Sequence, residues 1–108
     1  KGFYIVAERN GEVVGQTLVT REWSDWRNGW FWWIQSVYVR PDARRTGVFR
    51  TLYQAVEERS RAVGGVAGLR LYVATGNRAA RKVYETLGML REDYVLYAYE
   101  PYRPPSST

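Results

Sequence analysis

The chain has 108 residues and a formal net charge of +5 at pH 7, and 45% of its residues are hydrophobic and 25% charged. This length suits one domain and excludes two, and the composition is that of a globular protein, not of a disordered one. The absence of cysteine and histidine removes disulfides, thiolate chemistry, the commonest metal ligand and the usual neutral-pH base. We therefore expect no metal site, and any catalysis must use carboxylates, tyrosines, backbone amides or a bound cofactor.

Three strands are predicted in the first 39 residues. Residues 2–8 and 13–20 are rich in β-branched and aromatic side chains, and the Asn10-Gly11 pair between them favours a tight hairpin turn. After a polar segment, residues 30–39 form the third predicted strand. This strand carries tryptophan on both faces, so we expect other elements to cover both.

The second half of the chain is predicted to alternate helices with strands. Apolar residues recur every three to four positions in two stretches that each end at glycine, which is typical of amphipathic helices, and a β-rich stretch follows each. The predicted elements are a helix over 48–63, a strand over 69–73, a helix over 79–87 and a tyrosine-rich strand over 93–100. The order β-β-β-α-β-α-β indicates one α/β (α+β) domain over residues 1–100, followed by a flexible tail over 101–108.

Positive charge is concentrated in the middle of the chain. Between Arg40 and Lys82 there are ten basic residues and three acidic ones. This concentration of charge favours a polyanionic ligand. Three kinds are open: a nucleic acid, a membrane surface or a phosphorylated cofactor. A solvated basic face is the alternative interpretation.

A basic loop joins the third predicted strand to the first helix. The first amides of a helix have no internal partner and carry a partial positive charge, so a helix start attracts anions. Arg44, Arg45 and Arg50 add full charges here, and Gly47 lets the backbone approach an anion closely. The loop lacks the lysine and second glycine of a P-loop. It indicates a phosphate-binding site, with a role in solubility as the alternative.

Two segments resemble motifs of one protein family. The loop Arg44-Arg45-Thr46-Gly47-Val48-Phe49 resembles motif A of the GNAT superfamily of N-acetyltransferases, which reads R/Q-x-x-G-x-G/A. The segment from Asn77 to Met89 resembles the family's N-x-x-A-x-x-x-Y-x-x-x-G-F. Phe49 departs from the pattern at a small position, and Met89 departs from it at an aromatic one.

The resemblance implies a GNAT-like fold, in which helices flank a mixed, mostly antiparallel central sheet. The family fold normally begins with a strand and two helices, and this chain begins after them. We therefore expect an N-terminally truncated domain, or a site wall that another chain supplies.

The resemblance also implies acetyl-CoA as cosubstrate, bound where the third and fourth strands splay apart. Its pantetheine arm would pair with the backbone of the third strand, and its pyrophosphate would lie on amides of the basic loop. The cofactor-binding residues implied are Val37, Tyr38, Val39, Arg44, Arg45, Thr46, Gly47, Val48, Phe49, Arg50, Asn77, Ala80 and Tyr84.

Tyr84 matches the family's general acid. A phenol with an ordinary pKa near 10 is protonated at pH 7, so it can donate a proton to a departing CoA thiolate. The alternative is that Tyr84 only occupies the apolar face of the predicted helix over 79–87.

The base and the acceptor site are predicted around the polar segment before the third strand. Glu22 is the tentative base, and Asp25 or a water held by Gln35 are alternatives. Carboxylates beside tryptophan suit a cationic amine through charge and cation-π contact. The predicted substrate residues are Glu22, Trp23, Asp25, Trp33 and Gln35. In the alternative, the tryptophans cap the sheet and the acids keep the loop soluble.

The combined hypothesis is an N-acetyltransferase that transfers an acetyl group from acetyl-CoA to a primary amine of a small molecule or a protein. A non-catalytic acyl-CoA-binding module is the alternative. Nucleic acid is not expected, because the aromatic residues lie away from the arginines. No apolar run approaches the roughly 20 residues of a membrane span and no signal-like segment opens the chain, so we expect no membrane partner and a cytoplasmic location. An exposed strand edge makes a homodimer a further expectation.

Overall fold

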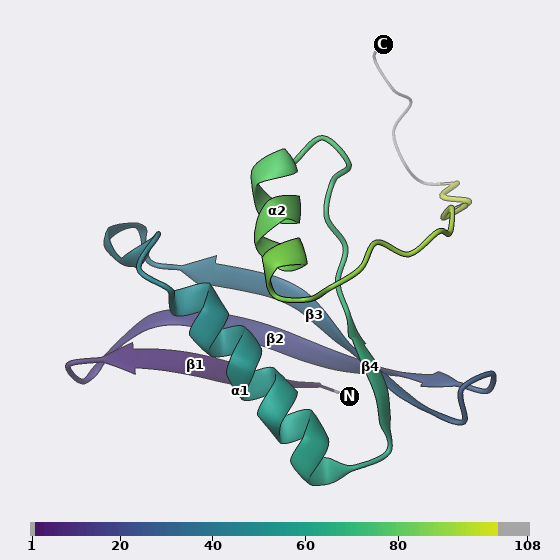
Figure 1. Ribbon diagram of the computed structural model, residues 1–108, viewed down its shortest axis with the longest axis horizontal. Coiled ribbons are helices and arrows are strands. Elements are labelled where there is room, and N and C mark those ends of the chain that lie inside the picture. The colour runs from purple at the N-terminus through teal and green to yellow at the C-terminus, as the bar shows by residue number, and fades with distance from the viewer. Residues whose placement is uncertain (1, 102–108) are drawn as a thin grey trace.

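A computed structural model describes residues 2–101 of the protein. Within these residues the sheet has the strand order β1 (Gly2–Arg9), β2 (Glu12–Ser24), β3 (Gly29–Val39) and β4 (Val66–Arg70). The first three strands are antiparallel neighbours, whereas β4 runs parallel to β3. The mixed, mostly antiparallel sheet that the family resemblance implies is therefore confirmed (Figure 1).

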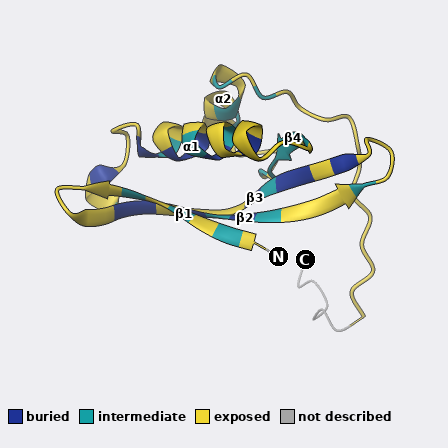
Figure 2. Ribbon diagram, turned by 90° about the horizontal axis from the view of Figure 1, so that it is seen from below, coloured by how far each residue is buried: buried dark blue, intermediate teal, exposed yellow. Residues whose placement is uncertain are grey.

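The helices follow β3 and β4. A short 3-10 helix, η1 (Pro41–Ala43), follows β3 and leads through the basic loop into α1 (Val48–Val63), and α2 (Arg78–Thr86) follows β4. The bounds of α1 coincide with the predicted helix over 48–63, because glycine stands at both of its ends. Figure 2 shows α1 and α2 over the same face of the sheet.

The core lies between α1 and the sheet. Val48, Leu52 and Val56 of α1 are buried, and they pack in two clusters with Val14 and with Val19 and Trp32. Burying an aliphatic side chain of this size contributes about 1.5–3 kcal/mol, so this layer dominates the stability of the fold. The opposite side of the sheet, here called the open face, has no helix over it in the described part of the chain (Figure 2).

An irregularity near the start of β2 lets α1 approach the sheet closely. The register of the β1–β2 pair shifts between Ala7 and Glu8, which leaves Val14 as an extra residue, and Val14 is 2% exposed. The next residue is Gly15, where a Cβ atom would lie 2.6 Å from Val48 Cγ1. Glycine at this position therefore removes a side chain that the helix would meet.

Two predicted boundaries are wrong by several residues. β2 continues to Ser24, through the first part of the segment predicted as a loop, because residues 20–24 pair with the start of β3. β4 covers residues 66–70 instead of 69–73, because pairing with β3 begins directly after Gly65, whose carbonyl accepts a hydrogen bond from Trp30 N (3.0 Å).

The predicted strand over residues 93–100 is wrong, because residues 91–100 contain neither helix nor strand. A strand needs a neighbour along most of its length, and the nearest sheet edge, β4, is five residues long. Tyr94, Val95, Leu96 and Tyr97 are each more than 70% exposed, so no packed surface supports a strand here either. Of the tail predicted over 101–108, residues 102–108 lie outside the described residues.

Candidate active site

β3 and β4 separate partway along their length. They pair from Trp30 and Val66 to Trp33 and Arg70, and after Arg70 the chain turns away from the sheet (Figure 1). Residues 34–39 of β3 therefore have no strand neighbour on this edge among residues 2–101. The predicted cofactor-binding residues Val37, Tyr38 and Val39 lie on this unpaired stretch, where the backbone groups that point away from β2 can bind an extended ligand, apart from the Val39 carbonyl, which accepts from Arg44 Nε.

A second irregularity adds to this separation. Leu18 pairs with Ser36 and Val19 pairs with Ile34, so Gln35 is an extra residue in β3. A bulge of this kind bends the strand that contains it. The bend occurs within two residues of Trp33, the last β3 residue that pairs with β4.

The basic loop is held in place by its own side chains. The Arg40 guanidinium donates to Asp42 Oδ1 (2.6 Å) and Glu12 Oε1 (2.9 Å), and these hydrogen bonds raise the pKa of Arg40 and lower that of Asp42. Arg44 Nε donates to the carbonyl of Val39 (3.0 Å). These two arginines therefore shape the loop at the end of β3.

The remaining polar groups of the loop surround the start of α1. Thr46 Oγ1 donates to the Ala43 carbonyl and accepts from Arg9 Nη2 (3.2 Å). The guanidinium groups of Arg45 and Arg50 are exposed and have no ion-pair partner within the described chain. The predicted loop residues 44–50 are thus brought together beside the unpaired edge of β3.

No side chain caps α1. Its N-cap residue is Gly47, with φ of +86°, and no side chain accepts a hydrogen bond from the first amides of the helix. The amides of Val48, Phe49 and Arg50 are thus available to an anion, and the helix dipole adds positive potential there. Glycine also favours the left-handed backbone conformation that this turn requires.

Tyr84 stands on α2 and contacts the start of α1. Its ring meets Phe49 edge-on with 5.6 Å between ring centres, and Phe49 also lies 6.3 Å from the ring centre of Tyr53. Partial burial raises the pKa of Tyr84 above its ordinary value, so its hydroxyl stays protonated at neutral pH. Phe49, which departs from the family motif, thus joins the two helices.

Asn77 acts as the N-cap of α2. Its Oδ1 accepts a hydrogen bond from the backbone amide of Ala80 (3.1 Å), which leaves its side-chain NH₂ free. Ala80 is half-buried in the first turn of the same helix.

Of the predicted acceptor residues, Glu22, Trp33 and Gln35 lie on the open face, whereas Trp23 packs edge-on against Trp30, its partner across the strands, on the helix side. Trp33 Nε1 donates to Glu22 Oε1 (2.8 Å), and Gln35 Nε2 donates to Thr20 Oγ1 (2.9 Å). Asp25 lies in the turn between β2 and β3 and accepts from Trp23 Nε1 (2.7 Å). Trp33 is the last residue of β3 that pairs with β4, so its hydrogen bond to Glu22 holds this carboxylate near the point where β3 and β4 separate.

A hollow of about 210 Å³ lies beside Glu22, and we call it the open-face hollow. Its lining residues are Glu22, Trp23, Ser24, Trp26, Arg27, Phe31, Arg70 and Tyr94. Sequence reasoning missed Arg27, Phe31, Arg70 and Tyr94. Strand alternation was a usable signal for Arg70, because it places Arg70 on the face opposite Leu69 and Leu71.

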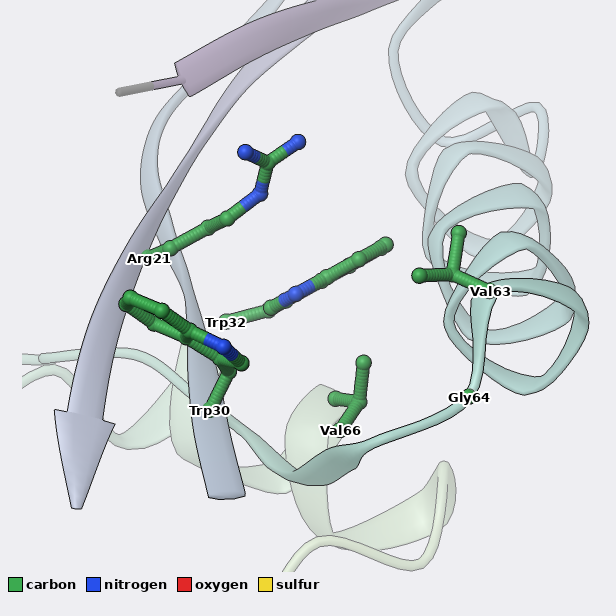
Figure 3. A pocket seen from close by; sticks show the side chains of 6 residues that line it. All are labelled: Arg21, Trp30, Trp32, Val63, Gly64 and Val66. Atoms are coloured by element: carbon green, nitrogen blue, oxygen red, sulfur yellow. The ribbon is translucent and has the colours of Figure 1, made fainter. Parts of the chain in front are cut away.

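A larger hollow of about 390 Å³ lies on the helix side of the sheet. Figure 3 shows Trp32 and Val63 extending toward one another, with Trp30 and Val66 below them and Arg21 above. It lies at the C-terminal end of α1, whereas the basic loop lies at the other end. No predicted site residue lines it.

Two features are absent from residues 2–101. No group of three or more acidic side chains is arranged to hold a metal ion. Neither α-helix in this range has the length and apolar character that a membrane crossing requires.

Comparison with known proteins identifies the family. The sequence matches the acetyltransferase (GNAT) family over residues 1–89. A possible acetyltransferase from Clostridium difficile 630 is 44% identical and superposes with a TM-score of 0.86, over 95% of this chain and 68% of that one.

Two more distant structures share the fold. One is a ribosomal-protein-alanine N-acetyltransferase from Brucella melitensis biovar Abortus 2308, with 18% identity and a TM-score of 0.77 over 90% of this chain and 69% of that one. The other is an aminoglycoside N-acetyltransferase in complex with CoA, with 21% identity and a TM-score of 0.74 over 90% of this chain and 74% of that one. The match over most of the sequence, together with the 44% identical relative, shows that the chain belongs to the acetyltransferase (GNAT) family.

Proposed function

We propose that the protein is an N-acetyltransferase that transfers an acetyl group from acetyl-CoA to a primary amine. One observation carries this proposal: the unpaired edge of β3 lies directly beside the uncapped, arginine-rich start of α1. The first feature suits an extended amide-containing arm, and the second suits a pyrophosphate.

The residues present fit acetyl-CoA. Backbone groups of residues 37–39 would hold the pantetheine arm as a neighbouring strand would. The amides of residues 48–50, with the Arg45 and Arg50 guanidinium groups, would hold the pyrophosphate by charge-assisted hydrogen bonds. The free side-chain NH₂ of Asn77 would reach the arm from the α2 side.

The chemistry requires two proton movements. Acetyl-CoA, when bound, supplies an acetyl group activated as a thioester. The amine nitrogen forms a bond to the acetyl carbon, the carbon–sulfur bond breaks, and the sulfur takes the proton that the Tyr84 hydroxyl holds. The amine gives up its own proton to the Glu22 carboxylate or to water, and the products are an amide and a thiol.

A binding module without turnover is the second candidate, and the packing of Tyr84 favours it. The contact between Phe49 and Tyr84 gives this tyrosine a structural task, which is to join α1 and α2. The two candidates make the same prediction for cofactor binding and opposite predictions for thiol release.

Calorimetric titration with acetyl-CoA tests the shared part of the proposal. We expect saturable binding that weakens about tenfold or more in the double variant Arg45→Ala/Arg50→Ala, because two charge-assisted contacts are lost. Arg61→Ala is the matched control, since Arg61 lies near the far end of α1 and pairs with Glu57. Binding that is equal in both variants would contradict the placement of the pyrophosphate.

Thiol release in the presence of a panel of primary amines then separates the candidates. Release that depends on the amine establishes the transferase. Tight binding of acetyl-CoA without release for any amine in the panel favours the module.

A further inference from the structure

Two arginines in the open-face hollow stack on one aromatic ring. The Arg70 guanidinium carbon lies 3.6 Å from the ring centre of Phe31, and that of Arg27 lies 5.6 Å from it. Phe31 is buried, so its ring is a fixed contact for both cations. Arg70 pairs with Trp33, which places it where β3 and β4 begin to separate.

The donors of these arginines are largely unused. Arg70 Nε is buried and has no hydrogen-bond partner, although a guanidinium has five N–H donors. The ion-pair partner of Arg70 is Glu92, whose Oε1 lies 3.4 Å from Nη2, a long contact to a half-exposed side chain. Arg27 has no ion-pair partner within residues 2–101. A ligand carboxylate that replaced Glu92 would accept from Nε and Nη2 together, which is the favoured bidentate arrangement.

The same hollow also offers a negative charge and an apolar wall. The Glu22 carboxylate lines it and is oriented by the indole of Trp33. Trp23, Trp26 and Tyr94 add aromatic surface. An occupant that satisfies all of these groups has an amine toward Glu22, an anionic group toward the arginines and an apolar body between them.

We infer that the acceptor is an amine that also carries a carboxylate, as in an amino acid with an apolar side chain. This inference rests on the proposed function and narrows its acceptor. Binding the carboxylate at Arg70 and Arg27 would hold the amine beside Glu22, near the open edge of β3. A polycationic acceptor would instead be repelled by Arg27, which has no ion-pair partner within residues 2–101, and by Arg70, whose contact with Glu92 is long.

Three probes of one shape test the inference: phenylalanine, phenylalaninamide and phenethylamine. Each has the same aromatic body and a primary amine, and phenylalanine alone has a carboxylate. Binding is measured by the tryptophan fluorescence of the full chain in the presence of acetyl-CoA, and turnover by thiol release. We expect phenylalanine to bind at least tenfold more tightly than the amide and the amine.

Variants assign this preference to the arginines. Arg70→Gln and Arg27→Gln should each weaken binding of phenylalanine at least tenfold and change binding of phenylalaninamide less than twofold. Arg70→Lys keeps the positive charge but lacks the planar guanidinium that binds a carboxylate through two hydrogen bonds. It should therefore retain part of the preference for phenylalanine over phenylalaninamide. Arg27 lies in an exposed turn, so its variant reports on the site even if Arg70→Gln fails to fold. Arg61→Gln, outside the hollow, should leave all three affinities unchanged.

The outcomes separate the inference from the proposed function. Equal binding of the acid and the amide, or faster acetylation of the polycationic aminoglycoside sisomicin than of phenylalanine, overturns the inference. Selective binding of phenylalanine without thiol release supports the anionic subsite and counts against the transferase. Thiol release with every amine at similar rates supports the transferase and overturns the subsite.

Discussion

Burial favours the protonated form of the Tyr84 hydroxyl. In the folded chain its pKa lies above the ordinary value of 10, because the phenolate would be poorly solvated beside Phe49. The folded state therefore holds this proton to a higher pH than the unfolded chain does. Stability that depends on it is complete below about pH 10 and is lost as the pH rises through the folded-state pKa.

Replacement of Tyr84 by phenylalanine tests its role. Tyr84→Phe keeps the ring contact with Phe49 and removes the acidic proton, so we expect kcat to fall about 10²- to 10⁴-fold with little change in acetyl-CoA affinity. The measurement is steady-state thiol release together with calorimetric binding. A kcat that is unchanged would assign the proton to another group, and a lost affinity would assign Tyr84 to cofactor binding.

At the scale of single residues, the sequence is a good guide where the signal is local. Asn10 and Gly11 both adopt positive φ in the turn between β1 and β2, as their residue types predict. The segment Arg44–Phe49 could be singled out because the family motif that it resembles is contiguous in sequence. Arg27 and Arg70 were missed because they meet on Phe31 only through strand register, which a single sequence does not specify.

The fit of α1 on the sheet depends on an element-scale feature, the bulge that brings Gly15 beneath Val48. In Gly15→Ala the added Cβ would lie 2.6 Å from Val48 Cγ1 and 3.2 Å from the Tyr38 carbonyl oxygen, so we expect a loss of about 1–3 kcal/mol in the free energy of unfolding.

A double-variant cycle with Val48→Ala isolates the cause. Removing the Val48 methyl groups makes room for the new atom, so the combined loss should be smaller than the sum of the two single losses. Chemical denaturation of the four proteins measures this. Additive losses would show that strain at Tyr38 or in the strand backbone is responsible.

The start of α2 depends on one side chain. Asn77 Oδ1 accepts from Ala80 N, and no other side chain caps this helix of nine residues. Asn77→Ala should therefore destabilise α2 by about 0.5–2 kcal/mol, whereas Asn77→Asp should retain the cap. Amide hydrogen exchange in α2 reports this directly. Equal protection in all three proteins would show that α2 is held by packing against Phe49 instead.

Element prediction from the sequence failed where pairing partners decide the outcome. The helix over 48–63 is correct because its periodicity and both terminal glycines are local signals. Residues 93–100 have the composition of a strand, but strand formation requires a neighbouring edge, and β4, the strand that precedes them in the chain, is only five residues long. The splay of β3 from β4 was implied by the family resemblance, and neither composition nor periodicity encodes it.

At the scale of the whole molecule, local pairing neutralises some cations of this chain of net charge +5 and leaves others free to meet a ligand. Arg40 is neutralised by Glu12 and Asp42, and Arg61 pairs with Glu57, whereas Arg45 and Arg50 have no such partner within residues 2–101. Arg45 and Arg50 thus leave unneutralised positive charge at the start of α1, where an uncapped helix adds to their potential.

This distribution predicts that binding of acetyl-CoA depends on salt. Exposed charges are screened over a Debye length of about 8 Å at 0.15 M and about 3 Å at 1 M, so affinity should fall roughly tenfold across this range. In Arg45→Ala/Arg50→Ala the dependence should be shallower, and in Arg61→Ala it should match that of the unaltered chain. Calorimetric titrations at four salt concentrations give the slopes. Affinity that does not change with salt would mean that backbone pairing along β3 holds the cosubstrate, and that the basic loop contributes shape without charge.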